Sequence, residues 1–155
     1  MASYGSMDKR RVGTLNGLDG NLIESKIANV EIDFGKGVFY KVGDEDKAYL
    51  ADSLDATLVF AGVASISQRS YGSTVGSYIA GDQVNVLREG EIWVQCTANN
   101  ASIAGKPVYL ANVVATTATY GKFTDASAGA YATGAYFKTN SDANGLALIE
   151  VRGLK

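Results

Sequence analysis

The sequence predicts an all-β fold, in which a single antiparallel β-barrel or β-sandwich domain follows an extended N-terminal arm. Apolar and polar residues alternate along several segments, which is the period of a strand with one buried face. These segments recur at spacings of roughly ten residues and are separated by glycine-containing turns, as in sandwiches and barrels. The chain has 18 glycines and one proline among its 155 residues, so glycine supplies most of the turns. A chain of this length fits one domain.

The first 29 residues differ from the rest. Their apolar residues are sparse and show no sustained period, and they contain a cluster of basic side chains: Lys9, Arg10 and Arg11. A terminus of this composition buries too little apolar surface to offset the entropy of ordering. We therefore predict an extended arm over residues 1–29, with a short helical turn at 22–28, and a β domain over residues 30–155.

The first strands are predicted between residues 30 and 66. Residues 30–34 and 38–42 alternate in polarity around a Gly-Lys-Gly break, which indicates a hairpin. Residues 43–48 are polar and predict a turn. Residues 57–66 form a continuous apolar run, which is typical of a buried central strand.

Residues 83–97 predict a second hairpin, with a two-residue turn at Glu89 and Gly90. In that register Arg88 faces Glu91 across the two strands. Opposite charges at such positions stabilise a sheet by up to about 1 kcal/mol. The same register places four side chains on one face: Leu87, Ile92, Val94 and Cys96.

The C-terminal third predicts three strands. Residues 105–111 form one, with Pro107 at its start, where a missing N–H donor is tolerated. Residues 128–139 and 145–153 flank an Asn-Ser-Asp-Ala-Asn turn and predict a terminal hairpin. The core of the whole domain is predicted to contain Val30, Ile32, Val59, Phe60, Val63, Val84, Val86, Ile92, Val94, Val108, Leu148 and Ile149.

Catalytic chemistry has few candidates in this chain. It contains no histidine and one cysteine, which excludes the Ser-His-Asp and Cys-His nucleophilic sites. Cys96 alternates in phase with Ile92 and Val94, which predicts a buried apolar side chain rather than a reactive thiol. A zinc site would need ligands that the chain lacks. We expect no catalytic residue and no cofactor.

Two acidic segments are candidates for binding a cation. Residues 44–46 are three adjacent carboxylates that could bind a cation or serve a glycosidase, but neighbouring carboxylates on a turn rarely converge, so a solvated turn is the favoured interpretation. Residues 140–145 match the first six positions of a calcium loop, which also requires a glutamate at its twelfth position. That position is Val151, and a hairpin turn rich in Asn, Asp and Gly explains the same residues. We expect no metal site.

The charge and hydropathy of the chain limit its partners. A net charge of −2 favours neither nucleic acid nor an anionic membrane. No apolar run approaches the roughly 20 residues of a membrane helix, and the N-terminus lacks an apolar signal core, so we expect a protein made without export. The basic cluster of the arm could touch nucleic acid, but solvation or docking on an acidic protein patch is favoured.

Aromatic side chains are the remaining candidates for binding, as a sugar platform or as an interface. Trp93 lies on the strand face opposite Ile92 and Val94, which predicts either a second core layer or a subunit contact. Tyr71 and Tyr78 follow the buried strand and are predicted to be exposed contact residues.

Several short motifs of the β domain occur in a characteristic order. They are Phe60-Ala-Gly-Val-Ala64, then Tyr78-Ile-Ala-Gly-Asp82 leading into Val84 and Val86, then Gly90, Ile92 and Val94, then Gly105-Lys-Pro-Val-Tyr109, and finally Ile149-Glu-Val151. Together they resemble the structural cement, or capsid decoration, proteins of tailed bacteriophages. The resemblance covers roughly residues 30–155 and none of the arm.

This resemblance implies a homotrimer on the outer surface of the virion capsid, assembled in the host cytoplasm. Its partner would be the major capsid protein, and it would stabilise the shell against the internal pressure of DNA without catalysis or cofactor. The contact candidates are then Lys9, Arg10, Arg11, Tyr71, Tyr78 and Trp93. The alternative is a β-sandwich module that binds carbohydrate, or an adhesin-like surface domain of the virion. A concave aromatic patch with converging polar groups would favour that alternative.

Overall fold

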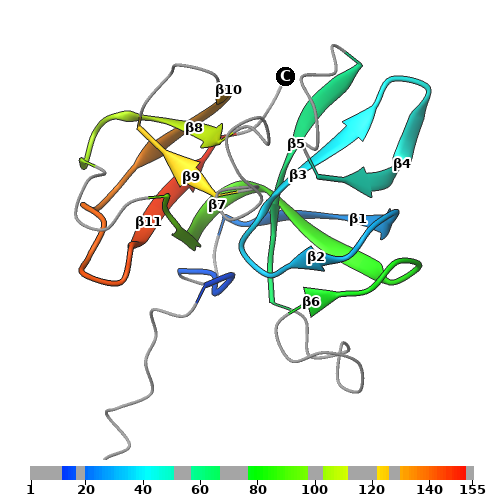
Figure 1. Ribbon diagram of the computed structural model, residues 1–155, viewed down its shortest axis with the longest axis horizontal. Coiled ribbons are helices and arrows are strands. Elements are labelled where there is room, and N and C mark those ends of the chain that lie inside the picture. Colours follow the sequence, from blue (N-terminus) through cyan, green and yellow to red (C-terminus); the bar gives the residue numbers. More distant parts are fainter. Residues whose placement is uncertain are drawn as a thin grey trace, which may run out of the picture.

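Eleven strands and no helix make up the part of the chain that the computed structural model describes: residues 12–16, 20–50, 57–66, 77–97, 103–111, 122–125 and 130–152 (Figure 1). The strands are β1 (Leu22–Ala28), β2 (Ile32–Asp33), β3 (Gly37–Lys41), β4 (Asp44–Tyr49), β5 (Leu58–Ala64), β6 (Ser77–Tyr78), β7 (Gln83–Gln95), β8 (Pro107–Ala111), β9 (Phe123–Thr124), β10 (Ala130–Phe137) and β11 (Leu146–Val151). The predicted all-β fold is confirmed.

Nine of these strands form one continuous sheet in the order β1-β4-β3-β5-β7-β11-β10-β8-β9. Because β1 also pairs with β7, the first five strands of this order close into a small barrel. Strands β2 and β6 form a separate antiparallel pair. The small barrel and the β2–β6 pair together make up the first lobe, which contains β1 to β6 and the N-terminal half of β7. It lies on the right in Figure 1.

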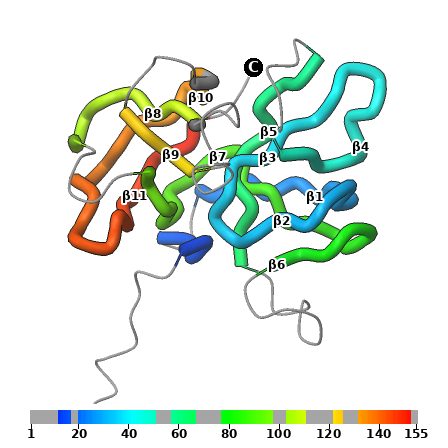
Figure 2. Tube along the Cα trace, viewed as in Figure 1, coloured from blue at the N-terminus to red at the C-terminus, as the bar shows by residue number. Residues whose placement is uncertain are grey.

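The second lobe contains the C-terminal half of β7 together with β8 to β11. The sheet of this lobe nearly closes into a second barrel. Cys96 forms a bridge with Phe123 of β9, and the Thr97 N–H donates to the Phe123 carbonyl at 2.9 Å. Strand β7 therefore belongs to both lobes: residues 83–89 pair with β1, and residues 90–95 pair with β11. The trace in Figure 2 shows β7 passing from one lobe to the other.

The two lobes diverge where β5 leaves β7. Among the described residues, β5 pairs with β7 only through Val63 and Ala64. Next to this point Gly62 has a φ of +147°, and a Cβ there would lie 2.2 Å from the Leu87 carbonyl oxygen. Only glycine allows two backbones to approach this closely, so Gly62 fixes the place where β5 separates from β7.

Two hydrophobic clusters fill the lobes. The cluster of the first lobe contains mostly small and β-branched side chains: Ala28, Ile32, Val38, Ala48, Leu50, Ala61, Ala64, Tyr78, Val84 and Val86. The second cluster fills the second lobe and also includes Phe39, Leu58 and Phe60 of β3 and β5. These three side chains extend the apolar core across the boundary between the lobes, so the lobes pack as one unit.

Several predicted elements are confirmed. Strand β5 lies within the apolar run 57–66 and is largely buried. Strand β8 begins at Pro107, and β10 pairs with β11 as the terminal hairpin, with Tyr136 opposite Glu150. In the turn of that hairpin, Oδ1 of Asp142 accepts the backbone N–H groups of Asn144 and Leu146, each at 2.9 Å. The turn interpretation of residues 140–145 is therefore correct.

The predicted hairpin over residues 83–97 is wrong. These residues form β7, one strand of 13 residues that continues through Gly90 with a φ of +138°. The Glu-Gly pair is a turn signal, but a straight strand here gains ladder hydrogen bonds with both β1 and β11. Arg88 consequently does not face Glu91, and its ion-pair partner is Glu24 at 3.4 Å.

The predicted hairpin of residues 30–34 with 38–42 is also wrong. Strand β2 pairs with β6, whereas β3 pairs with β4 and β5. The turn that joins β3 to β4 is Val42-Gly43, because Lys41 stands opposite Asp44. Most of the acidic segment 43–48 is therefore strand rather than turn.

Residues 22–28 form β1 and not a helical turn. Upstream of β1, the Gly13 N–H donates to the Trp93 carbonyl at 2.8 Å and the Trp93 N–H donates to Thr14 at 3.0 Å. The described part of the predicted arm is thus bound to β7 as part of the sheet. The predicted core is confirmed except for Val30, which is 36% exposed, and Val59, which is half-buried.

Candidate binding surfaces

Of the six contact residues predicted from the sequence, the structure describes two. Lys9, Arg10, Arg11 and Tyr71 lie outside the described residues. Trp93 is half-buried, and its backbone is covered by residues 13–14. Tyr78, predicted to be exposed, is only 1% exposed.

Tyr78 is a core residue because both its ring and its hydroxyl have partners inside the first lobe. The ring packs edge-on against Phe34 with centroids 5.1 Å apart. The hydroxyl donates to the Ser65 carbonyl oxygen at 2.6 Å, and the Asn85 N–H approaches the same hydroxyl at 3.4 Å. A buried tyrosine needs such a partner for its hydroxyl. Tyr78 therefore positions β6 and is not a contact residue.

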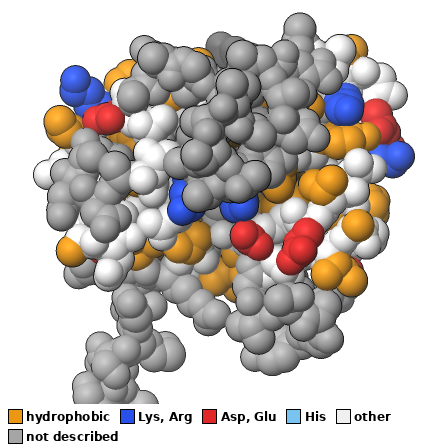
Figure 3. All heavy atoms as spheres, viewed as in Figure 1, with side chains coloured by type: hydrophobic (Ala, Val, Ile, Leu, Met, Phe, Trp, Pro, Cys, Tyr) orange, Lys and Arg blue, Asp and Glu red, His pale blue; other side chains and the backbone are white. Residues whose placement is uncertain are grey.

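An apolar surface that the sequence analysis missed lies around β1. Its members are exposed apolar side chains, and we call them the β1 surface: Leu22, Ile23, Ile27, Val30 and Ile79. Ile79 belongs to the turn whose Gly81 N–H donates to the Ala28 carbonyl, which holds this turn against the end of β1. Figure 3 shows hydrophobic side chains exposed over the right-hand part of the molecule, where β1 lies.

The β1 surface had a sequence signal. Ile23, Ser25 and Ile27 alternate with Glu24 and Lys26, which is the period of a strand. The usual polarity is reversed near the end of this strand, where Lys26 is 5% exposed while Ile27 is 45% exposed. This reversal of the usual polarity places apolar side chains outside, and such patches on a protein surface commonly mark interaction sites.

Two charged side chains of β1, Glu24 and Lys26, line a groove between the two lobes with a volume of about 480 Å³. Its wall in the first lobe includes Glu24 and Lys26 of β1, Tyr40 of β3 and Arg88 of β7. Among the described residues of the second lobe, its wall includes 132–134 of β10. The groove is therefore the space left where β5 and β11 separate along β7.

Lys26 is the most buried charge in the groove. Its ammonium group donates to the Glu45 backbone carbonyl and lies 3.8 Å from a Glu24 carboxylate oxygen. The charge also faces the Tyr40 ring, with Nζ 5.0 Å from the ring centroid. Arg88 contacts the same Glu24 carboxylate at 3.4 Å. The two cations thus share one carboxylate.

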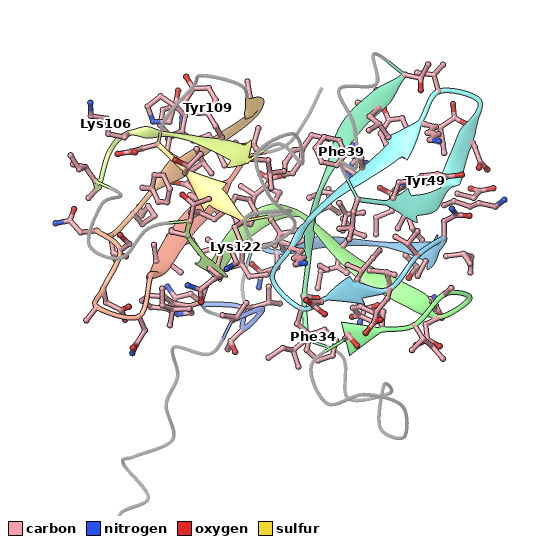
Figure 4. All side chains as sticks on the ribbon, viewed as in Figure 1. Phe34, Phe39, Tyr49, Lys106, Tyr109 and Lys122 are labelled. Atoms are coloured by element: carbon pink, nitrogen blue, oxygen red, sulfur yellow. The ribbon has the colours of Figure 1, made fainter. Side chains whose placement is uncertain are left out.

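The acidic residues of β4 form local contacts. The Gly43 N–H donates to Oε1 of Glu45 at 3.0 Å, and this backbone hydrogen bond is the main reason that the pKa of Glu45 lies below its ordinary value of 4.5. The Tyr49 hydroxyl, labelled in Figure 4, donates to Asp44 at 2.5 Å, which raises the tyrosine pKa above its ordinary value of 10.0. The three carboxylates alternate along a strand and do not converge.

The second lobe carries a ladder of charges on its outer surface. Glu91 of β7 stands directly opposite Glu150 of β11, which is an unfavourable like-charge pair. The ammonium of Lys138 lies 3.8 Å from each of these carboxylates, and the Asn16 amide donates to Glu91 at 2.6 Å. Arg152 adds a contact to Glu150 at 3.9 Å. This arrangement neutralises the pair.

The described residues offer little for catalysis or metal binding. They contain no group of three or more His, Cys, Asp or Glu side chains that could hold a metal ion. Cys96 is buried within the second cluster, as its alternation with Ile92 and Val94 predicted. The described parts of the chain contain no helix that could span a membrane. The surface features above are therefore the candidates for function.

Comparison with known proteins identifies the family. The family model described as "Structural cement protein (E217 gp24/Pam3 gp6)" matches residues 3–152, which is almost the whole chain. The chain belongs to the phage structural cement protein family. Membership gives the protein a structural, capsid-associated role in the virion, which agrees with the resemblance of its motifs.

Solved structures share the fold of this cement protein. A chain from "The capsid of Myoviridae Phage XM1" superposes with a TM-score of 0.71, at 23% sequence identity, over 92% of this chain and 89% of that one. A search of the curated proteins found no match. The shared fold extends over both lobes, because the superposition covers nearly the full length of each chain.

Proposed function

We propose that this cement protein binds the outer surface of the major capsid shell as a homotrimer and stabilises the shell against the pressure of packaged DNA. The observation that carries the proposal is the match of residues 3–152 to the structural cement family. A protein that bridges neighbouring capsid subunits adds binding free energy, which must be lost before the seam between them opens. The protein needs no catalysis for this task.

The proposal is supported by the kind of surface that the fold presents. A cement protein acts through extended, shape-matched contacts rather than through an enclosed pocket. The β1 surface offers apolar side chains from one strand and an adjoining turn: Leu22, Ile23, Ile27, Val30 and Ile79. We assign this surface to the contact between subunits of the trimer, since symmetric association would bury it.

The residues before Val12 provide the second part of the attachment. This segment contains Lys9, Arg10 and Arg11, which complement acidic groups on the capsid. Three such arms on one trimer would bind together, so modest single contacts would give firm attachment through avidity. The charged part of this attachment should weaken with salt, because exposed charges are screened over about 8–10 Å.

The decisive experiment compares filled heads with and without the protein. DNA release on heating is followed by dye fluorescence, and heads that lack the protein should release DNA at a lower temperature while keeping the same shell geometry. Adding back the purified protein should restore the release temperature. Release at the same temperature with and without the protein would overturn the cement function.

A sugar-binding role would need a concave aromatic platform. Two aromatic side chains, Tyr40 and Phe60, line the groove between the lobes, and Phe60 is buried in the core. No observation on the described residues therefore favours the carbohydrate-binding alternative.

A further inference from the structure

A short segment upstream of β1 lies along the C-terminal half of β7, and we call it the clasp: residues 12–16 (Figure 2). Two backbone hydrogen bonds join it to Trp93, at 2.8 and 3.0 Å. The Asn16 N–H donates to the Glu91 carbonyl at 2.9 Å, and the Asn16 side-chain amide donates to the Glu91 carboxylate at 2.6 Å. Leu15 packs against the hydrophobic cluster of the second lobe. The clasp is therefore bound to the second lobe through both its backbone and its side chains.

The first lobe holds the other side of the clasp. The N–H of Ile66, just after β5, donates to the Gly13 carbonyl at 2.9 Å. Gly13 has a φ of +85°, and a Cβ there would lie 2.9 Å from the Phe34 Cβ. Gly35 has a φ of +81°, and a Cβ there would lie 2.2 Å from Cγ1 of Val12. Two glycines thus let the clasp and the first lobe approach more closely than a side chain would allow.

The clasp stands between two regions to which the proposed function assigns contacts. In the chain it directly follows Arg11, the last residue of the basic cluster, and β1 begins at Leu22, soon after the clasp ends. Strand β7 pairs with β1 up to Glu89 and with the clasp from Glu91 onward. One strand therefore carries both segments in line, across the boundary between the lobes.

We infer that the clasp locks the two lobes in one arrangement and that Gly35 is the residue that positions it. This lock fixes the point at which residues 1–11 join the folded body, relative to the β1 surface. Two contact regions that are held in one arrangement before binding lose less conformational entropy when they bind, so preorganisation increases affinity. The lock itself stands on the contacts above, whereas its benefit for attachment rests on the proposed function.

A methyl group at position 35 tests the lock, because it acts on the clasp directly. The three atoms nearest to a Cβ at Gly35 all belong to Val12 and Gly13. Gly43→Ala is the matched control, since Gly43 has a φ of +91° and open space around the added Cβ. Both substitutions strain a backbone with positive φ, but only Gly35→Ala displaces the clasp.

Two measurements follow the clasp. Trp93 is the only tryptophan of the chain and is half-buried, so its fluorescence reports on its neighbours. Acrylamide quenching should rise about twofold in Gly35→Ala, because release of the neighbouring segment opens one side of the indole to solvent. The amides of Ile66 and Trp93 are hydrogen-bonded to the clasp and should exchange with solvent about tenfold faster, as measured by NMR. The Phe137 amide, bonded within the second lobe, should not change, and Gly43→Ala should change none of these values.

A second substitution distinguishes the lock from general strain at Gly35. Val12→Ala removes the methyl carbon that the new Cβ meets, so adding it to Gly35→Ala should return quenching and exchange toward the values of Gly43→Ala. Circular dichroism establishes that each variant folds. If Gly35→Ala does not fold, the unmodified protein decides: its Ile66 and Trp93 amides should exchange as slowly as the amides that join β7 to β11.

The arrangement of the lobes is measured with two spin labels. Lys47→Cys in the first lobe and Asn144→Cys in the second lobe replace exposed side chains and carry the labels, whereas Cys96 is buried and stays unlabelled. Double electron–electron resonance should give one narrow distance in the otherwise unmodified protein and with Gly43→Ala. With Gly35→Ala it should give a broad distribution.

Filled heads then connect the lock to attachment. In the heat-release measurement, Gly35→Ala should require about tenfold more added protein than Gly43→Ala to restore the DNA release temperature. Equal requirements would overturn the benefit of the lock for attachment. If the unmodified protein also fails to restore the temperature, the proposed function is overturned, and the solution measurements still decide the lock.

Any of four results in solution would overturn the lock. They are equal quenching and exchange in Gly35→Ala and Gly43→Ala, a double variant that does not differ from Gly35→Ala, the same label distances with and without Gly35→Ala, and fast exchange of the Ile66 and Trp93 amides in the unmodified protein.

Discussion

The two lobes share β7 but close their sheets in different ways. In the second lobe the central pairing is the hairpin of β10 and β11, whose strands are joined by a short turn. In the first lobe β1 joins β7 in antiparallel orientation, and the paired residues Ile23 and Leu87 lie 64 positions apart in the chain. Strand β1 also pairs in parallel with β4. The first lobe is therefore closed by a pairing between distant segments, whereas the closing bridge of the second lobe, between Cys96 and Phe123, spans 27 positions.

The two lobes also differ in the side chains that they expose to solvent. The second lobe has a core containing Phe123 and Phe137 and a charged outer ladder around Lys138. The first lobe exposes Ile23 and Ile27 on β1 and turns Lys26 inward. Because the features suited to binding all involve β1, the strand that closes the first barrel is also the strand that presents the candidate contacts. The predictions below compare matched positions in the two lobes.

The largest effect is expected where the lobes separate. Gly62→Ala would place a Cβ 2.2 Å from the Leu87 carbonyl oxygen at a φ of +147°, so it adds a backbone clash to conformational strain. We expect a loss of about 3 kcal/mol or more in the free energy of unfolding. In the second lobe, Gly105→Ala has a positive φ but open space around the Cβ, and about 1 kcal/mol is expected. Urea denaturation measures both. Equal losses would show that Gly62 does not fix the separation.

The next prediction tests whether association belongs to the first lobe. Ile27→Lys introduces a charge into the β1 surface and should raise the concentration at which the trimer dissociates by at least tenfold, equivalent to about 2.8 kcal/mol per trimer because the trimer dissociation constant scales with the square of this concentration. Ile103→Lys is the matched control in the second lobe, since Ile103 is 51% exposed and Ile27 is 45% exposed. Sedimentation equilibrium gives the oligomeric state of each. A trimer that tolerates Ile27→Lys would remove the β1 surface from the subunit contact.

Two tyrosines provide a smaller comparison. Tyr78→Phe removes a buried hydroxyl of the first lobe, which donates to the Ser65 carbonyl oxygen at 2.6 Å. We therefore expect a loss of about 1–2 kcal/mol in unfolding free energy. Tyr136→Phe in the second lobe changes a side chain that is 37% exposed, and its effect should stay within about 0.5 kcal/mol. Thermal and chemical denaturation should agree on this order. The reverse order would contradict the structural role of Tyr78.

The part of the fold that could be predicted from the sequence is the part built from local contacts. The terminal hairpin was predictable because its turn, rich in Asn, Asp and Gly, and its two strands lie within about 25 residues. Asp142 is a typical turn residue, and its carboxylate accepts the Asn144 N–H. The buried strand β5 was predictable because an apolar run of that length must be covered on both faces. The resemblance of the motifs to cement proteins added the family.

The first lobe was harder to predict because its pairings join distant segments. Periodicity identifies a strand but not its partner, so β2 and β3 were assigned to each other although β2 pairs with β6. Gly90 was interpreted as a turn because nothing local reveals that β1 and β11 both pair with β7. Tyr78 was assigned to the surface for the same reason, since its hydroxyl partner Ser65 lies across a loop. Burial of Lys26 follows from tertiary packing alone.

The smallest effect is expected on the outer charge ladder. Lys138→Ala removes the cation between Glu91 and Glu150, which stand directly opposite each other on β7 and β11. The remaining like charges should cost about 0.5 kcal/mol of unfolding free energy at low salt, and this loss should nearly disappear in 1 M NaCl, where charges are screened within about 3 Å. In the first lobe, Lys47→Ala removes a single exposed contact with Asp44 at 3.7 Å, whereas Lys138 contacts two carboxylates, so the effect of Lys47→Ala should be smaller at any salt concentration. Denaturation curves at 20 mM NaCl, where the Debye length is about 20 Å, and at 1 M NaCl, where it is about 3 Å, measure the difference. A loss for Lys138→Ala that does not change with salt would indicate that Lys138 acts through packing, and the ladder would then have no electrostatic role.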